Sequence, residues 1–492
     1  MFIIYLGCLL LLLYYFLTKD YDYWQSKNIP FEKPVFIFGS FHKIVTRKQH
    51  LFYRIREIYD TYKTPHFGIY IFHKPALVIR DPKLLKKVFV KDFNKFMNRE
   101  LASNEKVDPL MYHSLFGSSD QVWKNLRTKL SPVFSSGKMK LMLPLMKECA
   151  ADLTACIEKS CGGKIEVRDV MKRYAVDNIS SCAFGINSYC LKNEKSEILE
   201  VSTKLVDFKS FVRNFSVFSF LFAPKFVDIF RLTFLDKDSA RYLINVFKET
   251  IREREKKQIL RNDLIDLLNN LKQNETFKED DKFDDLKMAA QAIQFFSAGN
   301  DTTSITISYT LYELAINRDI QDRLRQEITE IFDKYGDFTY EAIQDMTYLD
   351  MVLNETLRKY PLTNYTDRRC EETYTFEETG LTVDKNICIL IPIAGLHYDP
   401  EYFPNPEKFD PERFSSENKH KIVPYTFLPF GEGPRNCIGQ RFAILVSKVA
   451  LAYSLKNFVF DRVESTKVPL ELDNGSPFIL NKGGLYLNVT KV

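Results

Sequence analysis

The chain has 492 residues, of which 45% are hydrophobic and 14% aromatic, including 41 phenylalanines. This composition predicts a folded protein with a large core and an apolar pocket, and it argues against a disordered chain. The 69 basic side chains outnumber the 64 acidic ones only slightly, and no basic block is interleaved with aromatic residues. The charge pattern therefore excludes a nucleic-acid-binding protein.

The nine cysteines are odd in number and irregular in spacing. A disulfide framework is disfavoured, and a reduced chain facing the cytosol is favoured. The seven histidines form no pair at the helical spacing of metal ligands, so a histidine-based metal centre is also disfavoured.

Residues 1–18 carry no charged side chain. As a helix they would be about 27 Å long, which suits the thin bilayer of the endoplasmic reticulum. A cleaved signal peptide is the competing interpretation, but no basic residue precedes the apolar run and no small-x-small cleavage site follows it. We expect an uncleaved transmembrane anchor over residues 1–18, with Lys19 and Lys27 favouring a cytosolic body.

Residues 19–40 contain Pro30 and Pro34 and predict a stiff linker, because proline fixes φ and stops a helix. No repeat or change in composition divides residues 41–492, which predicts one large domain. Alternation over residues 66–80 predicts a β-hairpin, and short strands are expected near 380–392 and 470–489. Helical periodicity covers much of the remainder, including 318–335 and 440–455, so the fold class is mainly α with small β-sheets. The polar stretch 261–282 is expected to be a solvated connection.

Trp123 and Arg127 lie one helical turn apart, so an indole N–H and a guanidinium can reach the same anionic group. Arg368 and Arg435 are further candidates for that role. Two buried carboxylates of a prosthetic group would need such neutralisation, and the fork of arginine suits carboxylates. Each arginine taken alone is more often a surface charge.

A helix is expected over residues 284–317, and its middle reads Ala298-Gly299-Asn300-Asp301-Thr302. Glycine weakens a helix interior, and threonine can hydrogen-bond to the carbonyl one turn earlier. A helix widened in this way leaves room for a diatomic ligand, to which Asp301 and Thr302 can relay protons. The alternative is a packing glycine beside a solvent-facing Asp-Thr pair.

Glu355 and Arg358 are three residues apart and share a helix face. Exposed pairs of this kind contribute little to stability. Arg413 follows in the segment Asp-Pro-Glu-Arg-Phe, shortly before a glycine-rich loop. We expect a buried Glu355 that is shared by Arg358 and Arg413.

Residues 430–439 read Phe-Gly-Glu-Gly-Pro-Arg-Asn-Cys-Ile-Gly. The glycines allow the backbone to approach a flat group, and backbone N–H groups at a helix start can stabilise the thiolate of Cys437. Such a thiolate can be the axial ligand of a haem iron, where it favours O–O cleavage. The alternative is that Cys437 is a small buried hydrophobe in an ordinary turn.

Together and in this order, these motifs resemble the cytochrome P-450 superfamily over essentially the whole chain. The text of residues 395–410 and 423–430 looks most like insect microsomal enzymes of the sixth family. The resemblance implies a mostly α fold that encloses haem b (iron protoporphyrin IX) between the central helix and the cysteine loop. It implies that Cys437 is the axial ligand and that Asp301 and Thr302 are catalytic. It also implies a structural triad of Glu355, Arg358 and Arg413, and cofactor contacts from Trp123, Arg127, Ala298, Arg368, Phe430, Gly431, Arg435 and Gly439.

The resemblance further implies substrate walls near residues 101–120, 206–222, 295–302, 362–365 and 477–479, with Phe295, Phe296, Leu362 and Phe478 as named candidates. The implied reaction is insertion of one atom of O2 into an apolar substrate, such as a xenobiotic or an endogenous lipid, hormone or pheromone. Electrons would come from NADPH through a reductase, with cytochrome b5 as a further partner, at the cytosolic face of the endoplasmic reticulum membrane. Lys124 and Lys129 are expected to help dock the reductase, and residues 208–234 to dip into the membrane, with core packing as the alternative.

Two other functions stay open at this point. One is a haem-thiolate isomerase or dehydratase that needs no reductase, against which the Asp301-Thr302 pair argues. The other is a non-catalytic haem-binding protein. The sequence does not identify the substrate.

Overall fold

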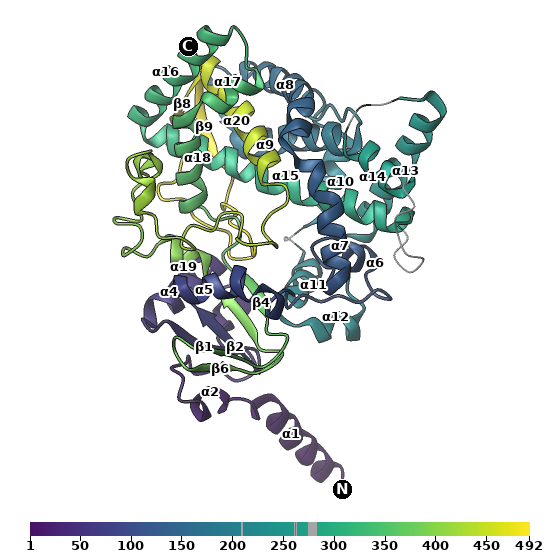
Figure 1. Cartoon of the computed structure of the whole chain (residues 1–492), viewed down its shortest axis with the longest axis vertical. Coiled ribbons are helices and arrows are strands. Elements are labelled where there is room, and N and C mark those ends of the chain that lie inside the picture. The colour runs from purple at the N-terminus through teal and green to yellow at the C-terminus, as the bar shows by residue number, and fades with distance from the viewer. Residues whose placement is uncertain (208–209, 260, 262, 274–282) are drawn as a thin grey trace.

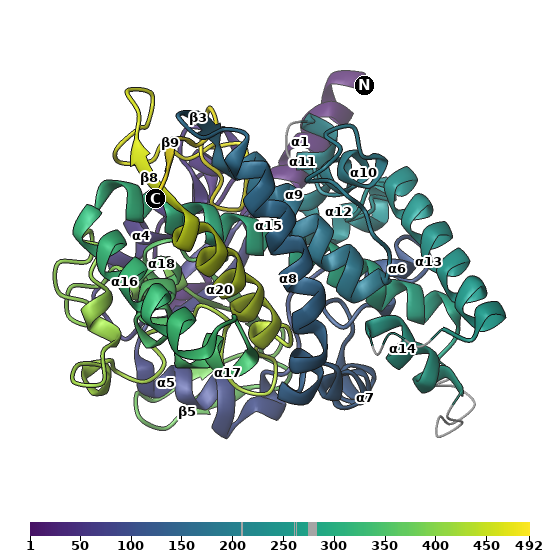
Figure 2. The same cartoon turned by 90° about the horizontal axis from the view of Figure 1, so that it is seen from above.

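A long central helix, α15 (Asp285–Ile316), crosses the molecule, and most of the other helices pack around it (Figures 1 and 2). The computed structural model describes residues 1–492 except 208–209, 260, 262 and 274–282. Apolar and small hydroxyl side chains surround α15 on nearly all sides, which is the pattern of a helix buried in the core of a large protein. The neighbours of α15 include α6, α9, α18 and α20.

The fold is mainly helical with small sheets, as the sequence predicts, and the described residues form three of them. The α-helices are α1 (Phe2–Thr18), α2 (Tyr23–Ser26), α3 (His42–Val45), α4 (Leu51–Thr61), α5 (Pro82–Lys86), α6 (Pro109–His113), α7 (Asp120–Leu130), α8 (Ser136–Glu158), α9 (Val167–Ile179), α10 (Glu197–Leu205), α11 (Phe211–Phe222), α12 (Pro224–Phe230), α13 (Lys237–Lys257), α14 (Leu264–Gln273), α15, α16 (Arg318–Tyr335), α17 (Tyr340–Asp345), α18 (Thr347–Lys359), α19 (Ile393–His397) and α20 (Gln440–Asn457). Short π or 3-10 turns are η1 (Lys87–Lys91), η2 (Phe93–Lys95), η3 (Ser131–Phe134), η4 (Ser180–Phe184), η6 (Pro411–Phe414) and η7 (Lys419–Lys421).

The largest sheet has the strand order β1-β2-β7-β4. Its strands β1 (His66–Ile71) and β2 (Lys74–Ile79) form the predicted hairpin, with His66 opposite Ile79. Strand β7 (Cys388–Ile391) runs parallel to β2 and antiparallel to β4 (Thr366–Arg369), which carries Arg368. The other sheets are β3 (Gly163–Glu166), β9 (Tyr486–Lys491) and β8 (Phe458–Arg462), and the pair β5 (Tyr374–Phe376) and β6 (Leu381–Val383).

Helix α1 extends away from the body at the end of the molecule that holds the largest sheet (Figure 1), and none of its side chains is buried. It has 17 residues and covers the segment predicted to be an anchor. Among the described residues, no helix combines the length and the apolar character that are needed to cross a membrane. The segment after α1 packs on the sheet, because Trp24 is fully buried and its indole N–H donates to the Ile69 carbonyl at 3.1 Å.

Prediction of the polar stretch 261–282 as a connection was partly wrong. Its first half forms α14, whose Leu264, Ile265 and Leu268 face the core. An apolar stripe at helical spacing was therefore present among the polar residues. Residues 262 and 274–282 of this stretch lie outside the described part of the chain.

Candidate functional site

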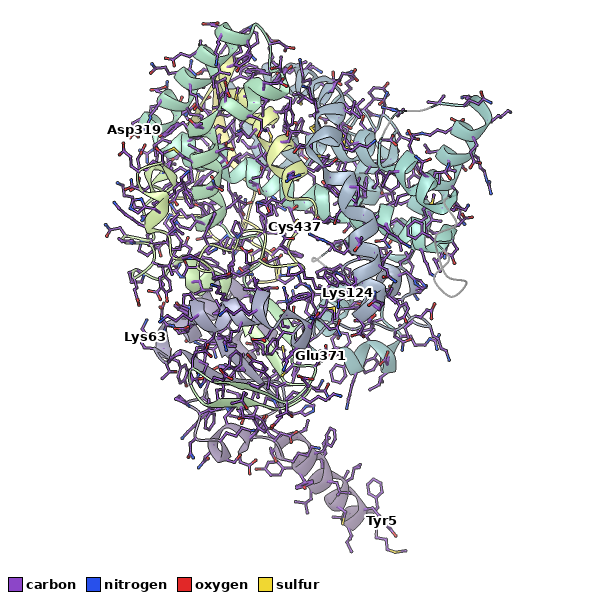
Figure 3. All side chains as sticks on the ribbon, in the orientation of Figure 1. Tyr5, Lys63, Lys124, Asp319, Glu371 and Cys437 are labelled. Carbon is purple, nitrogen blue, oxygen red and sulfur yellow. The ribbon has the colours of Figure 1, made fainter. Side chains whose placement is uncertain are left out.

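The cysteine loop lies near the centre of the molecule, where Figure 3 labels Cys437. Its turn uses two glycines in the left-handed region, Gly431 with φ of 71° and Gly433 with φ of 75°. The Cys437 N–H donates to the Phe430 carbonyl at 2.8 Å, and α20 begins three residues after Cys437. A Cβ on Gly433 would lie 2.0 Å from the Phe89 carbonyl oxygen, so packing against η1 as well as backbone conformation requires glycine there.

Cys437 has an accessible side chain although it lies inside the protein. Burial raises the pKa of its thiol, while the Gly439 backbone N–H and the Arg127 guanidinium act to lower it. Arg127 also holds the preceding residue, since it donates to the carbonyl and side-chain oxygens of Asn436 at 2.7 and 2.6 Å. A sulfur that is held in place, accessible and next to a cation suits an anionic ligand of a metal.

Arg368 and Arg435 are buried cations without a carboxylate hydrogen-bonded to either of them among the described residues. The Arg368 Nε has no hydrogen-bond partner in the described structure, and burial with the nearby Arg99 cation lowers the pKa of Arg368 well below its usual range. Arg435 donates to the carbonyls of Met97 and Ser118, and its guanidinium lies 4.8 Å from the Trp123 ring centroid. Burial and Arg99 lower the pKa of Arg435 to about 9.

Arg99 is a third cation in this cluster, and the sequence analysis missed it. It pairs with Asp367 at 3.4 Å, and Asp367 also accepts the Glu100 backbone N–H. Buried positive charge is costly unless an anion compensates it. The surplus of guanidinium groups therefore suits the two propionates of a haem, and the accessible Cys437 suits its iron. No local motif marks Arg99, so only its contacts could reveal it.

Helix α15 is mostly buried, but its middle is accessible at Ala298 and Thr302, and we call this part of the helix the accessible window. Ala298 is exposed, and Thr302, one turn later, is partly exposed and donates from Oγ1 to the Ala298 carbonyl at 2.6 Å. This is the predicted back-bond, but the helix stays continuous and the expected widening is absent from it. A Cβ on Gly299 would meet Ile179 at 2.9 Å, which makes Gly299 a packing glycine against α9.

Asp301 lies next to the window and faces α9, where its Oδ1 is 3.6 Å from the Lys172 Nζ. The pair is partly exposed, with accessible side-chain fractions of 30% for Asp301 and 20% for Lys172. An acid at this position is connected to solvent and to a cation, which is compatible with proton transfer along the helix.

The structure brings Glu355, Arg358 and Arg413 together. Arg358 donates to Glu355 from Nε at 2.7 Å and from Nη2 at 2.8 Å, and both side chains are fully buried. Arg413 Nε lies 3.4 Å from the same carboxylate, which also accepts the Asp410 N–H. Burial acts to lower the pKa of Arg358, but the Glu355 carboxylate keeps it above its usual range.

The four named substrate candidates differ in environment. Phe296 is 1% exposed and packs against Phe184. Phe295 packs on Phe134, whose ring is also the nearest protein group to a Cβ built on Gly439. Leu362 and Phe478 are partly exposed.

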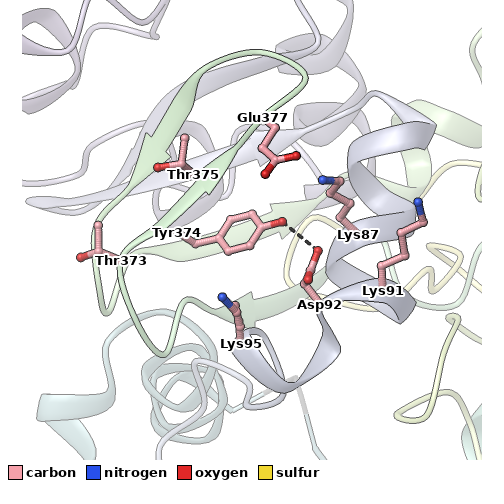
Figure 4. Close-up of a pocket in the computed structure, with 8 residues that line it drawn as sticks. All are labelled: Lys87, Lys91, Asp92, Lys95, Thr373, Tyr374, Thr375 and Glu377. Carbon is pink, nitrogen blue, oxygen red and sulfur yellow. Dashed lines mark hydrogen bonds between the residues drawn. The ribbon is translucent and has the colours of Figure 1, made fainter.

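A separate polar recess of about 440 Å³ lies between η1, η2 and the β5–β6 hairpin (Figure 4). Its lining includes Lys87, Lys91 and Lys95, and the Tyr374 hydroxyl donates to Asp92 at 2.8 Å. Lys87 and Lys95 are paired with Glu378 and Glu372. Charged walls of this kind do not suit an apolar substrate, and none of the predicted site residues lines the recess.

Comparison with known proteins agrees with these features. The family "Cytochrome P450" matches residues 29–489. Cytochrome P450 6k1 of Blattella germanica is 39% identical, over 99% of this chain and 96% of that protein. Cytochrome P450 6j1 of the same insect is 38% identical over 97% and 95%, and Cytochrome P450 6A1 of Musca domestica is 37% identical over 99% and 97%. The chain belongs to the cytochrome P450 superfamily of haem-thiolate monooxygenases, and the relatives named above are insect enzymes of the sixth cytochrome P450 family.

Proposed function

We propose that this protein is a membrane-attached monooxygenase that oxidises apolar small molecules, such as xenobiotics or endogenous lipids, hormones or pheromones, with electrons from NADPH supplied by a reductase. The observation that carries the proposal is the surplus of guanidinium groups, with Arg368 and Arg435 buried and Arg99 partly buried, in the same core as the accessible Cys437. When bound, haem would supply the activation of O2, with one oxygen atom inserted into the substrate and the other leaving as water.

In this proposal Cys437 would ligate the iron, and Arg127 fixes the ligand loop through Asn436. Arg99, Arg368 and Arg435 would neutralise the propionates, and Trp123 packs against Arg435. Thr302 delivers protons from Oγ1, and Asp301 resupplies them from the solvent side of α15. The apolar side chains near Ala298 and Phe295 exclude water and favour an apolar substrate.

Docking of an acidic electron donor is proposed at the basic face beside the cysteine loop. Lys124 lies on α7, the helix whose Arg127 binds Asn436 of the cysteine loop. The Lys124 Nζ donates to the side-chain oxygen of Asn94 in η2. Lys129 lies on the same helix. Charge steering at such a face would act on the association rate and weaken with salt. Reversing the charge of both lysines should remove much of the salt dependence of reduction, and an unchanged salt dependence would exclude this face.

Membrane attachment is proposed through α1 together with α11 and α12. Phe226, Ile229 and Phe230 are 40%, 67% and 56% exposed. Phe72 contacts Phe226, while the neighbouring His73 contacts Phe16 of α1, so the apolar surfaces adjoin. Location at the endoplasmic reticulum, with the body on the cytosolic side, is part of this proposal. A chain without residues 1–18 should still bind vesicles, and Phe226→Ser with Phe230→Ser should weaken that binding.

The proposed reaction is tested by reconstitution with a reductase and NADPH on a panel of apolar compounds, scored by product mass. Products that carry one added oxygen and require both NADPH and O2 would support the proposal. Rearrangement or dehydration of a peroxide without reductase would indicate the isomerase class. A haem-loaded protein without either activity, on a panel that a related insect enzyme oxidises under the same conditions, would indicate a non-catalytic haem protein.

A further inference from the structure

His397, the last residue of α19, is fully buried between α18 and the segment that leads into the cysteine loop. Its Nδ1 lies 3.1 Å from the Arg358 carbonyl oxygen. Its Nε2 accepts the Leu428 backbone N–H at 2.8 Å, and its own carbonyl accepts from Arg358 Nη1 at 2.9 Å. One imidazole therefore joins the Glu355–Arg358 pair to the residue two positions before Phe430.

Only one protonation state satisfies both ring contacts. Nδ1 must carry the hydrogen that is donated to the Arg358 carbonyl, and Nε2 must keep its lone pair to accept from Leu428. The rings of Phe427 and Phe403 lie near the imidazole, and the Arg358 guanidinium is close. Burial and this cation lower the pKa of His397 to about 3, in agreement with a neutral ring.

The connection continues from Leu428 to the sulfur through two further backbone bonds. The Leu428 carbonyl accepts the Gly431 N–H at 3.1 Å, and the Phe430 carbonyl accepts the Cys437 N–H at 2.8 Å. Leu428 is itself fully buried, so its N–H would have no access to water if the imidazole were lost. The acceptor at His397 Nε2 thus fixes the start of the loop whose other end carries Cys437.

We propose that His397 is a positioning residue for the Cys437 thiolate, which it holds in register by anchoring the Leu428 N–H to the buried Glu355–Arg358 pair. The inference rests on the proposed function in that Cys437 is taken as the haem ligand. It assigns to the imidazole a role that the triad does not fill, because in the described part of the chain the triad side chains form no hydrogen bond or ion pair with residues 427–437.

Two amide variants separate the two ring contacts. The Oε1 of His397→Gln can accept from Leu428 as Nε2 does, whereas the amide of His397→Asn reaches only as far as Nδ1. The fraction of ferrous carbon-monoxide complex with the red-shifted Soret band of a thiolate ligand is measured in each holoprotein. We expect His397→Gln to keep this band and His397→Asn to lose most of it. His420→Asn, at an exposed histidine, is the control and should match the wild type.

Hydrogen exchange of the Leu428 amide gives a readout that does not depend on haem chemistry. This amide should exchange slowly in the wild type and about tenfold faster or more in His397→Asn, with His397→Gln close to the wild type. Equal Soret fractions and equal exchange in the two variants would overturn the proposal. If neither variant folds, rapid exchange of Leu428 in the wild type would overturn it and strong protection would support it. A wild-type holoprotein without the thiolate band would instead refute the proposed haem ligation.

Discussion

Among alanine substitutions of the glycines in the cysteine loop, Gly433→Ala is expected to be the most destabilising. At a φ of 75°, an alanine costs about 1–2 kcal/mol in backbone conformation. Its Cβ would also lie 2.0 Å from the Phe89 carbonyl oxygen and 2.9 Å from the Phe89 carbonyl carbon, where ordinary contact begins at 3.4 Å. Phe89 cannot yield easily, because it is fully buried and its ring lies 5.2 Å from the Arg368 guanidinium.

Overpacking of this kind adds about 1–3 kcal/mol, so we expect Gly433→Ala to lose about 2–5 kcal/mol of unfolding free energy. Gly431→Ala is the matched control. It has nearly the same φ, 71°, but its Cβ would meet only the Asn436 Cα at 3.9 Å, so it should lose about 1–2 kcal/mol. Gly439→Ala, at a φ of −88° with only Phe134 at 4.0 Å, should lose less than about 1 kcal/mol in the apoprotein.

Urea unfolding of the three apoprotein variants, followed by far-ultraviolet circular dichroism, measures these differences. Equal losses for Gly431→Ala and Gly433→Ala would refute the claim that Phe89 packs against the loop. If Gly439→Ala leaves the apoprotein unchanged but weakens haem retention, its glycine serves the approach of the flat group, as the sequence predicts.

Three further predictions concern buried charge. Glu355→Leu strands the Arg358 guanidinium and should cost about 3–5 kcal/mol in urea unfolding, whereas a loss below 1 kcal/mol would argue that the pair is not buried in solution. Arg368→Leu removes a buried cation to which no carboxylate of the described residues is hydrogen-bonded, so the apoprotein should become more stable while haem dissociates faster; slower dissociation would contradict the propionate assignment. The pKa of His397 is about 3 in the folded protein and about 6.5 in the unfolded chain. As the pH falls, the unfolded chain therefore takes up a proton on this residue before the folded protein does. The contribution of His397 is therefore complete above pH 6.5 and falls by about 1.4 kcal/mol per pH unit towards pH 3; His397→Gln should show a shallower acid dependence, and an unchanged one would place that proton elsewhere.

Local patterns predicted much of the fold. Helix α16 has the predicted bounds because its apolar spacing ends at Gly336, which adopts a φ of 71° as a helix cap. The hairpin β1–β2 follows from alternation alone. Helix α14 was missed because its few core-facing residues stand among polar ones, and their burial depends on neighbours that are distant in the sequence.

In the candidate site, too, some residues could be predicted from local sequence motifs and others could not. Cys437, Glu355 and Thr302 stand in dense motifs, so their spacing carries the signal. Arg99 contacts a residue that is hundreds of positions away in the sequence, and His397 contacts a residue on another helix. No local sequence pattern predicts either contact. The substrate roles of Phe295 and Phe296 stay predictions, because a helix with apolar residues all round does not reveal which of them face a pocket.

The central claim is that Cys437 is the thiolate ligand of a haem. The ferrous carbon-monoxide spectrum tests it most directly, on the wild type, on Cys437→Ser and on Cys161→Ser as a control at a partly buried cysteine elsewhere in the chain. The wild type and the control should show the red-shifted Soret band of a thiolate ligand, and Cys437→Ser should lose it. A red-shifted band of unchanged intensity in Cys437→Ser would contradict the assignment.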